Sequence, residues 1–428
     1  GYVVIDGNLV YVYSQDASVL NGTIGEMHAK KIANLYDLAM KTGAPVIGLI
    51  DSAGLRLQEA ADALNGFGEI YMKQVNASGV IPQITAIFGT CGGGLAVVPT
   101  LTDFTFMEEK KAKLFVNSPN AIDGNEVSKC DTASAAFQSE EAGIVDVVAG
   151  EADVLAQIRE LVSMLPANNE DTMAYEECAD DLNRVCEGLE NCAGDTSIAL
   201  SQISDNGVFF ETKRNYAKDM VTGFIKLNGA TVGAVANRTE VYGEDGKAAD
   251  KFEAVLSPEG CEKAADFIGF CDAFDIPVLS LTNVKGYAST KCAEKKMAKA
   301  AARLTYAFAN ATVPKVNVIT LKAMGSAYVA MNSKAIGADI TMAWPDAEIG
   351  TMDAKLAAKI ICDGKGAEAI DECAKEYAAL QTSAVSAAKR GYVDQIVAPE
   401  DTRKYVIGAF EMLYTKHEER PAKKHGTV

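Results

Sequence analysis

One constant offset of 232 residues relates two stretches of this chain, and it limits the possible folds more than any other feature. In each stretch a proline precedes an apolar run, and a glycine follows that run at the same spacing. The matched positions are Pro45 and Pro277, Gly54 and Gly286, Pro82 and Pro314, and Gly93 and Gly325. A repeat this long is far outside the period of a solenoid. The sequence therefore predicts two copies of one domain.

The pattern within each copy is that of an α/β domain. Short apolar runs of strand length alternate with longer segments whose apolar residues recur at helical spacing. The elements that we expect in the first copy are a hairpin over 2–5 and 9–14, helices over 26–41 and 55–72, and strands over 46–50 and 84–88. Such alternation favours a largely parallel sheet, with loops gathered at the carboxyl ends of its strands.

Composition changes between the two copies. Residues 168–195 are rich in Asp, Glu and Asn, and the apolar pattern begins again near residue 221. We therefore predict an N-terminal domain over residues 1–166, a solvated acidic linker with a short helix over 167–220, and a C-terminal domain over 221–428.

The net charge of −18 argues against nucleic acid or an anionic membrane as the main partner. No apolar run approaches the ~18 residues that span a bilayer. The chain starts at Gly1, already within an expected strand, so we expect that an N-terminal piece is missing. The ten cysteines contain no Cys-x-x-Cys pair, and Cys178, Cys186 and Cys192 match no common zinc spacing. We therefore expect free thiols, no metal site and a cytoplasmic location.

The glycine-rich run at 89–94 is the strongest candidate for a functional site. A phosphate-binding P-loop requires Gly-Lys-Ser/Thr at its end, but Leu95 follows Gly94. The run does match a nucleophile elbow built on Cys91, for which His28 is the only reasonable base. Tight packing of a helix against a strand is a third, purely structural interpretation.

The remaining interpretation is an oxyanion hole, in which backbone N–H groups stabilise a developing negative charge on oxygen. Gly54 and the pair Gly93 and Gly94 end neighbouring strands, so amides from both loops are expected to converge on one carbonyl oxygen. The second copy supplies a corresponding set, namely Gly286, Gly325, Ser326 and Ala327. Two such holes predict two carbonyl reactants, one bound to each copy.

At these residues the chain resembles the carboxyltransferase subunits of biotin-dependent acyl-CoA carboxylases, of the propionyl-CoA carboxylase β type. It is also similar to the carboxyltransferase subunits of sodium-pumping acyl-CoA decarboxylases. The resemblance extends over nearly the whole chain. The segments that carry it are 51–59, 89–94, 322–328, 343–349 and the tail 421–426.

The resemblance implies two duplicated crotonase-like domains and a hexamer built from dimers, with each active site between the N-terminal half of one subunit and the C-terminal half of another. It implies that Gly93 and Gly94 hold the acyl thioester oxygen, and that Ser326 and Ala327 hold the ureido oxygen of biotin. The residues that it places around coenzyme A and biotin are Gly54, Arg56, Gly286, Tyr287, Gly325 and Tyr328. Candidates for binding the phosphates of coenzyme A are Lys30, Lys31, Arg56 and Lys73.

The implied reaction moves a carboxyl group between carboxybiotin and the α-carbon of a short acyl-CoA, propionyl or acetyl, through an enolate. The biotin nitrogen can act as the base, which suits a chain with three histidines. The sequence lacks a Met-Lys-Met biotinylation site, so biotin is expected on a separate carrier protein. A biotin carboxylase or a membrane decarboxylase subunit is then the implied partner.

Two departures from the family pattern lie on the biotin side. The family has Pro-Gly-Phe followed by a Gln-Glu pair where this chain has residues 284–291, and it has glycine where this chain has Ser326. Three alternatives therefore remain open: the reverse, decarboxylating direction, a crotonase-fold hydratase or hydrolase that uses one hole, and a catalytically silent scaffold.

Overall fold

A computed structural model describes residues 1–171, 175–243, 245–423 and 426. The chain divides into two compact units. Unit 1 comprises residues 1–174, 212–216 and 273–275, and unit 2 comprises residues 175–211, 217–272 and 276–428. Two residues of the family-like tail, Lys424 and His425, lie outside the described residues.

Unit 1 is built on a sheet with the strand order β1-β2-β3-β4-β5-β7, with β6 paired to β4. Only β1 and β2 are antiparallel, as the predicted hairpin requires, and the other pairs are parallel. The strands are β1 (Tyr2–Ile5), β2 (Asn8–Ser14), β3 (Val46–Ser52), β4 (Gln83–Gly92), β5 (Phe104–Glu108), β6 (Lys113–Phe115) and β7 (Val147–Ala149). The helices are α1 (Glu26–Thr42), α2 (Ala60–Ala77), α3 (Val97–Thr100), α4 (Ala135–Glu140) and α5 (Glu151–Met164).

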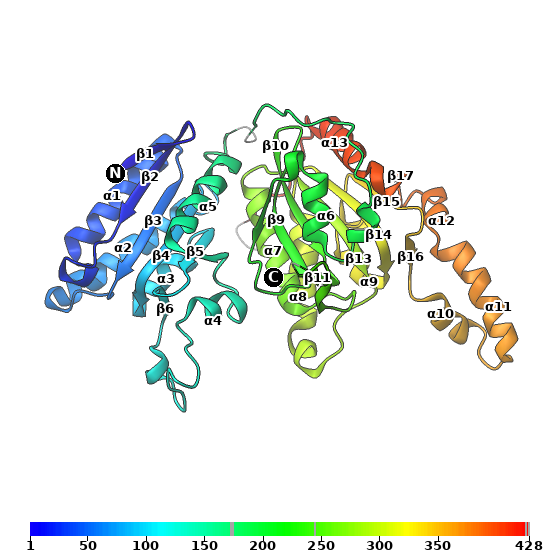
Figure 1. Cartoon of the computed structure of the whole chain (residues 1–428), viewed down its shortest axis with the longest axis horizontal. Helices are drawn as coiled ribbons and strands as arrows, with labels where there is room; N and C mark the ends of the chain where they lie inside the picture. Colours follow the sequence, from blue (N-terminus) through cyan, green and yellow to red (C-terminus); the bar gives the residue numbers. More distant parts are fainter. Residues whose placement is uncertain (172–174, 244, 424–425, 427–428) are drawn as a thin grey trace. The chain divides into compact units, whose positions relative to one another are not determined.

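The core of unit 1 lies between this sheet and the pair α1 and α2, which run side by side in Figure 1. Both helices bury one face, and Tyr36 of α1 and Ile70 of α2 are almost fully buried there. The helix expected over 55–72 begins later, because Ala60 has a φ of 45° and interrupts the helix after the short turn η2 (Leu57–Glu59).

Unit 2 repeats this arrangement with the strand order β17-β15-β14-β13-β10-β9-β8, and β16 is paired to β14. The strands are β8 (Phe209–Thr212), β9 (Met220–Leu227), β10 (Ala230–Asn237), β11 (Glu240–Tyr242), β12 (Ala248–Lys251), β13 (Val278–Val284), β14 (Lys315–Met324), β15 (Ile340–Ala343), β16 (Glu348–Gly350) and β17 (Gln395–Ile396). The helices are α6 (Thr196–Ile203), α7 (Pro258–Ala273), α8 (Lys291–Asn310), α9 (Gly325–Ala330), α10 (Ala354–Ile361), α11 (Ala367–Tyr377), α12 (Ala384–Lys389) and α13 (Thr402–Leu413).

The 232-residue offset holds in the hydrogen-bond register of the central strands. In β3 and β4, Val46 pairs with Gln83, and in β13 and β14, Val278 pairs with Lys315. Each pair of strands has an irregularity near its carboxyl end, after which Ser52 pairs with Cys91 and Val284 with Ala323. The isolated bridges Ile24–Leu55 and Leu256–Tyr287 differ by the same offset. The predicted duplication of an α/β domain is therefore confirmed down to single residues.

The segment expected to be a solvated linker is more ordered than its composition indicates. Part of it forms α6, and Leu189, Leu200 and Ile203 are buried in the same core cluster as strands of unit 2. These apolar residues pack against the sheet. Of the acidic residues in the segment, Glu190 is exposed, while Asp180, Asp195 and Asp205 pair with arginines. The domain boundaries at residues 166 and 221 stay a prediction.

Two further features complete the fold. In unit 2, α10 and α11 form a hairpin that projects beyond β16 (orange in Figure 1), and the turn of π-helix Ala378–Thr382 follows it. Among the described residues, no helix has both the length and the apolar character that crossing a membrane requires.

Candidate active site

The two glycine turns lie at equivalent places in the two units. In unit 1, β4 runs through Gly92, and Gly93 opens the short helix η3 (Gly93–Ala96), which continues into α3. In unit 2, β14 ends at Met324 and Gly325 opens α9. The φ angles of Gly93 and Gly325 are 64° and 63°, in the left-handed region that glycine adopts without a steric cost. Each turn therefore depends on one glycine at its first residue.

The strand before the first turn is longer than predicted. We expected a strand over 84–88 followed by a glycine loop, but β4 continues to Gly92 because Thr90–Gly92 pair with β6. The glycine turn therefore comprises only Gly93 and Gly94, and not the whole run 89–94. The first N–H groups of a helix have no partner within it, so the N–H groups of these two residues are available to a ligand. Gly94 is exposed and Gly93 is half-buried.

The 232-residue offset pairs Gly94 with Ser326 and Leu95 with Ala327. Ser326 is exposed, like Gly94, whereas Ala327 is only 1% exposed, like Leu95. The methyl group of Ala327 is thus buried, and a ligand cannot contact this side chain. Tyr328 is half-buried against a core cluster, and burial raises the pKa of its hydroxyl to about 12.

Gly54 lies against the first turn but does not offer a free amide. It has a φ of 96°, and a Cβ added to it would lie 3.2 Å from the carbonyl oxygen of Gly92. Its N–H donates to Ser52 Oγ at 3.1 Å, and its carbonyl accepts from the N–H of Ile24 at 2.8 Å. The expected convergence of amides from both loops is thus reduced to Gly93 and Gly94, because the Gly54 N–H has an internal partner.

Gly286 repeats only part of this arrangement. Its carbonyl accepts from Leu256 N–H at 3.0 Å, as Gly54 does from Ile24, and the offset is again 232 residues. A Cβ added to Gly286 would meet no atom within 4 Å, and its φ is not left-handed. The neighbouring Tyr287 is half-buried and bridges to Leu256. The backbone here is open, so a ligand can approach closely.

Arg56 has a structural set of partners. Its guanidinium donates to the carbonyl of Thr23 at 2.7 Å and to Glu59 Oε1 at 2.8 Å. The other carboxylate oxygen of Glu59 accepts from the N–H of Glu26 at the start of α1, at 2.6 Å. Arg56 and Glu59 therefore join the loop after β3 to the start of α1, and a phosphate at Arg56 has to compete with this ion pair.

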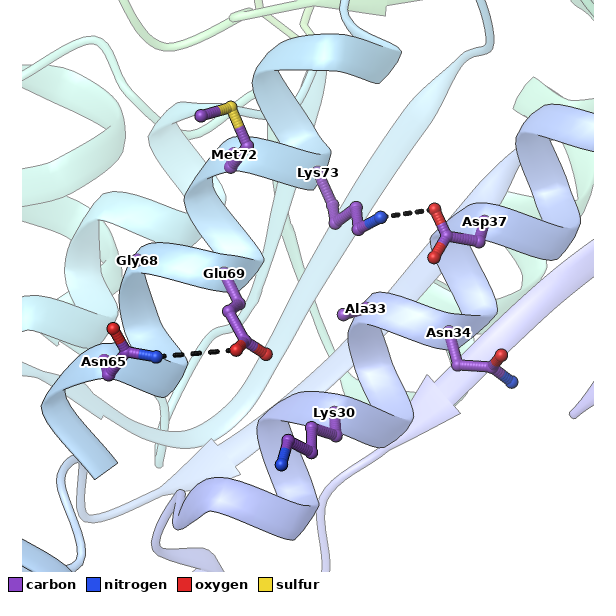
Figure 2. Close-up of a pocket in the computed structure, with 9 residues that line it drawn as sticks. All are labelled: Lys30, Ala33, Asn34, Asp37, Asn65, Gly68, Glu69, Met72 and Lys73. Atoms are coloured by element: carbon purple, nitrogen blue, oxygen red, sulfur yellow. Dashed lines mark hydrogen bonds and ion pairs between the residues drawn. The ribbon is translucent and has the colours of Figure 1, made fainter. Parts of the chain in front are cut away.

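The lysines suggested for coenzyme A phosphates lie partly in a groove between α1 and α2, of 560 Å³ (Figure 2). Lys73 Nζ is 2.5 Å from Asp37 Oδ1, and Lys30 Nζ is 2.5 Å from Glu26 Oε1. Glu69 faces the same groove, so positive charge here is largely balanced by carboxylates. Lys31 is exposed and stays a candidate, as do the other three cations.

Asp51 in unit 1 and Asn283 in unit 2 are equivalent residues whose role sequence reasoning missed. The Asp51 carboxylate accepts from the N–H of Thr90 at 3.2 Å, and the Asn283 side-chain oxygen accepts from the N–H of Lys322 at 3.3 Å. Both bonds hold the strand just before its glycine turn. The 232-residue offset relates both donors and both acceptors, so the repeat itself contained the signal.

This contact predicts an effect for Gly89→Ala. A Cβ at Gly89 would lie 2.0 Å from Asp51 Oδ1, so the variant must push Asp51 away and loosen the turn. We expect it to lower the free energy of unfolding by about 1–3 kcal/mol, which is typical of overpacking. Chemical denaturation measures this value. The matched control is Gly68→Ala on exposed α2, where a Cβ meets no atom within 4 Å and no loss is expected. Equal stability of the two variants would contradict the role of Asp51.

The cysteine elbow is excluded by burial. Cys91 is fully buried, its thiol faces the carbonyl of Leu95, and burial raises its pKa well above the usual value. A reactive cysteine requires an accessible thiolate. The proposed base, His28, has its Nδ1 3.3 Å from the carbonyl oxygen of Thr23, and burial lowers its pKa. The hydrolase interpretation built on Cys91 is therefore wrong.

Comparison with known proteins agrees with this architecture. The carboxyl transferase domain family matches residues 1–428. The methylmalonyl-CoA decarboxylase subunit alpha of Propionigenium modestum is 39% identical, over 100% of this chain and 84% of its own. The propionyl-CoA carboxylase beta chain of Roseobacter denitrificans is 38% identical, over 100% of this chain and 85% of its own. A transcarboxylase 12S structure, solved as a hexamer with hydrolysed methylmalonyl-CoA bound, has a TM-score of 0.92 at 35% identity and covers 100% of this chain and 84% of its own.

A duplicated α/β fold with a glycine turn at the end of the same strand in each copy defines the crotonase-like class, as predicted. The chain belongs to the carboxyl transferase family. It is an acyl-CoA carboxyltransferase, and the resemblance seen in the sequence is confirmed.

Proposed function

We propose that this protein moves a carboxyl group between biotin and the α-carbon of propionyl-CoA or another short acyl-CoA, with one glycine turn serving each reactant. The observation that carries the assignment is the pair of equivalent turns, with left-handed Gly93 and Gly325 at the same place in two related units. Names of relatives support both directions, because a decarboxylase subunit and a carboxylase chain match this chain equally well.

On the acyl side, the N–H groups of Gly93 and Gly94 donate to the thioester oxygen. Removal of the α-proton places negative charge on this oxygen, and the two donors stabilise the enolate. One such donor typically contributes roughly 3 kcal/mol to lowering the barrier. A Cβ at Gly93 would meet no protein atom within 4 Å, so the space in front of the turn is open to the thioester.

On the biotin side, the backbone at Ser326 and Ala327 holds the ureido oxygen of biotin. The residues that line this biotin site are Gly286, Tyr287, Gly325 and Tyr328. The fit to biotin is supported by the open backbone at Gly286 and by the exposed Ser326. Biotin supplies the carboxyl group and the nitrogen that takes the α-proton. The Tyr328 hydroxyl is protonated at neutral pH, as an ordinary tyrosine is, and can donate a hydrogen bond; burial raises its pKa further, to about 12.

The direct test is transfer of a labelled carboxyl group from methylmalonyl-CoA to free biotin by the purified protein. We expect propionyl-CoA and carboxybiotin in equal amounts. Ser326→Trp is expected to abolish transfer, because Ser326 is exposed and the indole fills the biotin side without entering the core. Ala327 is unsuitable for this test, because it is buried and a bulky residue there disturbs packing.

Two outcomes would overturn the proposal. The first is that the purified protein is folded but transfers no carboxyl group, which would favour a silent scaffold. Alternatively, Ser326→Trp turns over acyl-CoA at the wild-type rate, which favours a hydratase or hydrolase that uses only the first turn.

The proposal includes a biotin carrier protein and either a biotin carboxylase or a membrane decarboxylase subunit as partners, and a dimer-based hexamer. Subunit names of the relatives and the hexamer of transcarboxylase 12S support this part. A cytoplasmic location is also proposed, since all ten cysteines are free thiols, as is usual in reducing compartments.

A further inference from the structure

Helix α2 holds the glycine turn of unit 1 through two side chains. The Tyr71 hydroxyl donates to the carbonyl oxygen of Gly94, and Gln74 Nε2 donates to the carbonyl oxygen of Val98 at 3.1 Å. The two donors are three residues apart and so face the same side of α2, while the two acceptors are four residues apart along the turn and α3. One face of α2 thus lies along the turn and α3 and holds their backbone through these two hydrogen bonds.

Tyr71 fixes the peptide group that follows the donor, because the Gly94 carbonyl belongs to the Gly94–Leu95 peptide and the Gly94 N–H to the preceding one. Gly92 is held by strand pairing to Phe115, and Gly94 is held by Tyr71 through its carbonyl oxygen. Only Gly93 lies between these two held residues. The peptide group between Gly93 and Gly94 carries the Gly94 N–H, so its orientation is restricted from both sides. Three consecutive glycines are otherwise the most flexible backbone that a chain can have.

Tyr71 is itself held in place. Its ring stacks on Phe67 with the centroids 6.1 Å apart, and it packs against the core cluster that contains Cys91. A Cβ at Gly94 would lie 3.3 Å from the Tyr71 hydroxyl oxygen, so the contact leaves no spare room. Burial also raises the pKa of the Tyr71 hydroxyl above its usual value.

The described part of unit 2 does not repeat these two hydrogen bonds. The positions equivalent to Tyr71 and Gln74 are Arg303, which pairs with Glu262 at 3.3 Å, and Tyr306, whose ring accepts Lys423 in a cation–π contact. Among the described residues, no side chain bonds to the carbonyl of Ser326 or Ala330, the equivalent acceptors. Ser326 and Ala327 have less backbone freedom than glycine, so this turn requires less support.

We propose that Tyr71 is a positioning residue for the enolate-stabilising turn, and that it acts by holding the Gly94 carbonyl, which restricts the neighbouring Gly93–Gly94 peptide that carries the donor N–H. Gln74 supports it from the next turn of α2. This inference rests on the proposed function of Gly93 and Gly94. It predicts that loss of the Tyr71 hydroxyl weakens transition-state stabilisation while acyl-CoA binding is kept, because the hydroxyl bonds to the backbone of the turn.

The experiment compares Tyr71→Phe with wild type in two measurements. In carboxyl transfer, we expect kcat to fall about tenfold and the KM for acyl-CoA to change by less than about twofold, as for a small misplacement of a catalytic group. In hydrogen–deuterium exchange without substrates, we expect faster exchange in the peptide over residues 91–98 and no change over 323–330. The matched control is Tyr306→Phe on α8, which is expected to alter neither kcat nor exchange over 91–98.

The two measurements separate the possible failures. Unchanged hydrogen–deuterium exchange over residues 91–98 in Tyr71→Phe overturns the claim that Tyr71 holds the turn, whatever reaction the enzyme performs. Faster exchange with an unchanged kcat overturns the positioning role. If the wild-type protein transfers no carboxyl group, the proposed function fails, while the exchange result still decides whether Tyr71 holds the turn. If Tyr71→Phe lowers the midpoint of thermal unfolding and reduces kcat and acyl-CoA binding equally, the positioning role of Tyr71 is also overturned, because that pattern indicates general unfolding.

Discussion

Replacing Gly93 with valine is expected to lower kcat for carboxyl transfer by about a thousandfold or more, because it removes the conformation on which the proposed oxyanion hole of unit 1 depends. The φ of Gly93 is 64°, and a β-branched residue is a genuine outlier there. The backbone must leave this region, and the N–H groups of residues 93 and 94 turn away from the thioester oxygen. Acyl-CoA binding is expected to persist, since the nucleotide end does not require these amides. Steady-state kinetics and calorimetric titration with propionyl-CoA measure the two effects.

Gly124→Val is the matched control for this variant. Gly124 also has a positive φ, 75°, and a Cβ there would meet no atom within 4 Å, as at Gly93. It lies in an exposed loop of the same unit. The control therefore introduces the same strain, about 1–3 kcal/mol, at a place without the proposed chemistry. We expect it to lose stability and to keep its kcat. A similar kcat in the two variants would show that strain rather than the oxyanion hole explains the loss.

The duplication of the fold could be predicted because of the repeat. Once Pro45 and Pro277 are aligned, each element of one unit is expected at the matching position of the other, and the registers of β3 with β4 and of β13 with β14 agree with this expectation. The order of the strands and the register itself were not predicted, because they depend on contacts between distant parts of the chain. The hairpin over 2–5 and 9–14 and the helix beginning at Glu26 are also as predicted. Hydrophobic period and turn residues are local signals, so a single sequence contains them.

The candidate site could be predicted only to the level of the turns. The sequence indicates that Gly54 and Gly93 lie close together, but not that the Gly54 N–H already has Ser52 as its partner. It likewise does not show that Arg56 binds Glu59, or that Tyr71 reaches the turn from a separate helix. These contacts depend on side-chain directions and on the packing of α2, which no local pattern specifies.

The acidic segment shows a third limit. Its composition predicted a solvated linker, because Asp and Glu are rarely buried without partners. Asp180 and Asp205 instead find partners in Arg184 and Arg403, which are distant in sequence or easily taken for surface cations. Composition cannot show such pairing, since the favourable energy arises only when both partners are placed.

Replacing Arg403 with methionine is expected to destabilise unit 2 by about 3–5 kcal/mol, the typical cost of removing one partner of a buried ion pair. Arg403 of α13 is 0% exposed. Its guanidinium donates to the carbonyl of Ile203 and to Asp205 Oδ1, both at 2.6 Å, and it lies 3.5 Å from Asp180. Methionine fills much of the volume but leaves the Asp205 carboxylate buried with one charge partner fewer. The free energy of unfolding from urea denaturation, or the midpoint of thermal unfolding, measures the loss.

Arg303→Met is the control that separates burial from charge. Arg303 pairs with Glu262 at 3.3 Å, but both side chains are about a third exposed or more, and such pairs contribute roughly 0–1 kcal/mol. The same change of residue is thus expected to have a large effect at 403 and a small one at 303. Arg403→Met is also expected to expose residues 180–205 to proteolysis, because the arginine ties this segment to α13. Equal stability of the two variants, with the segment still protected, would show that apolar packing of Leu189 and Leu200 alone orders it, and that the acidic residues are as dispensable as a linker composition suggests.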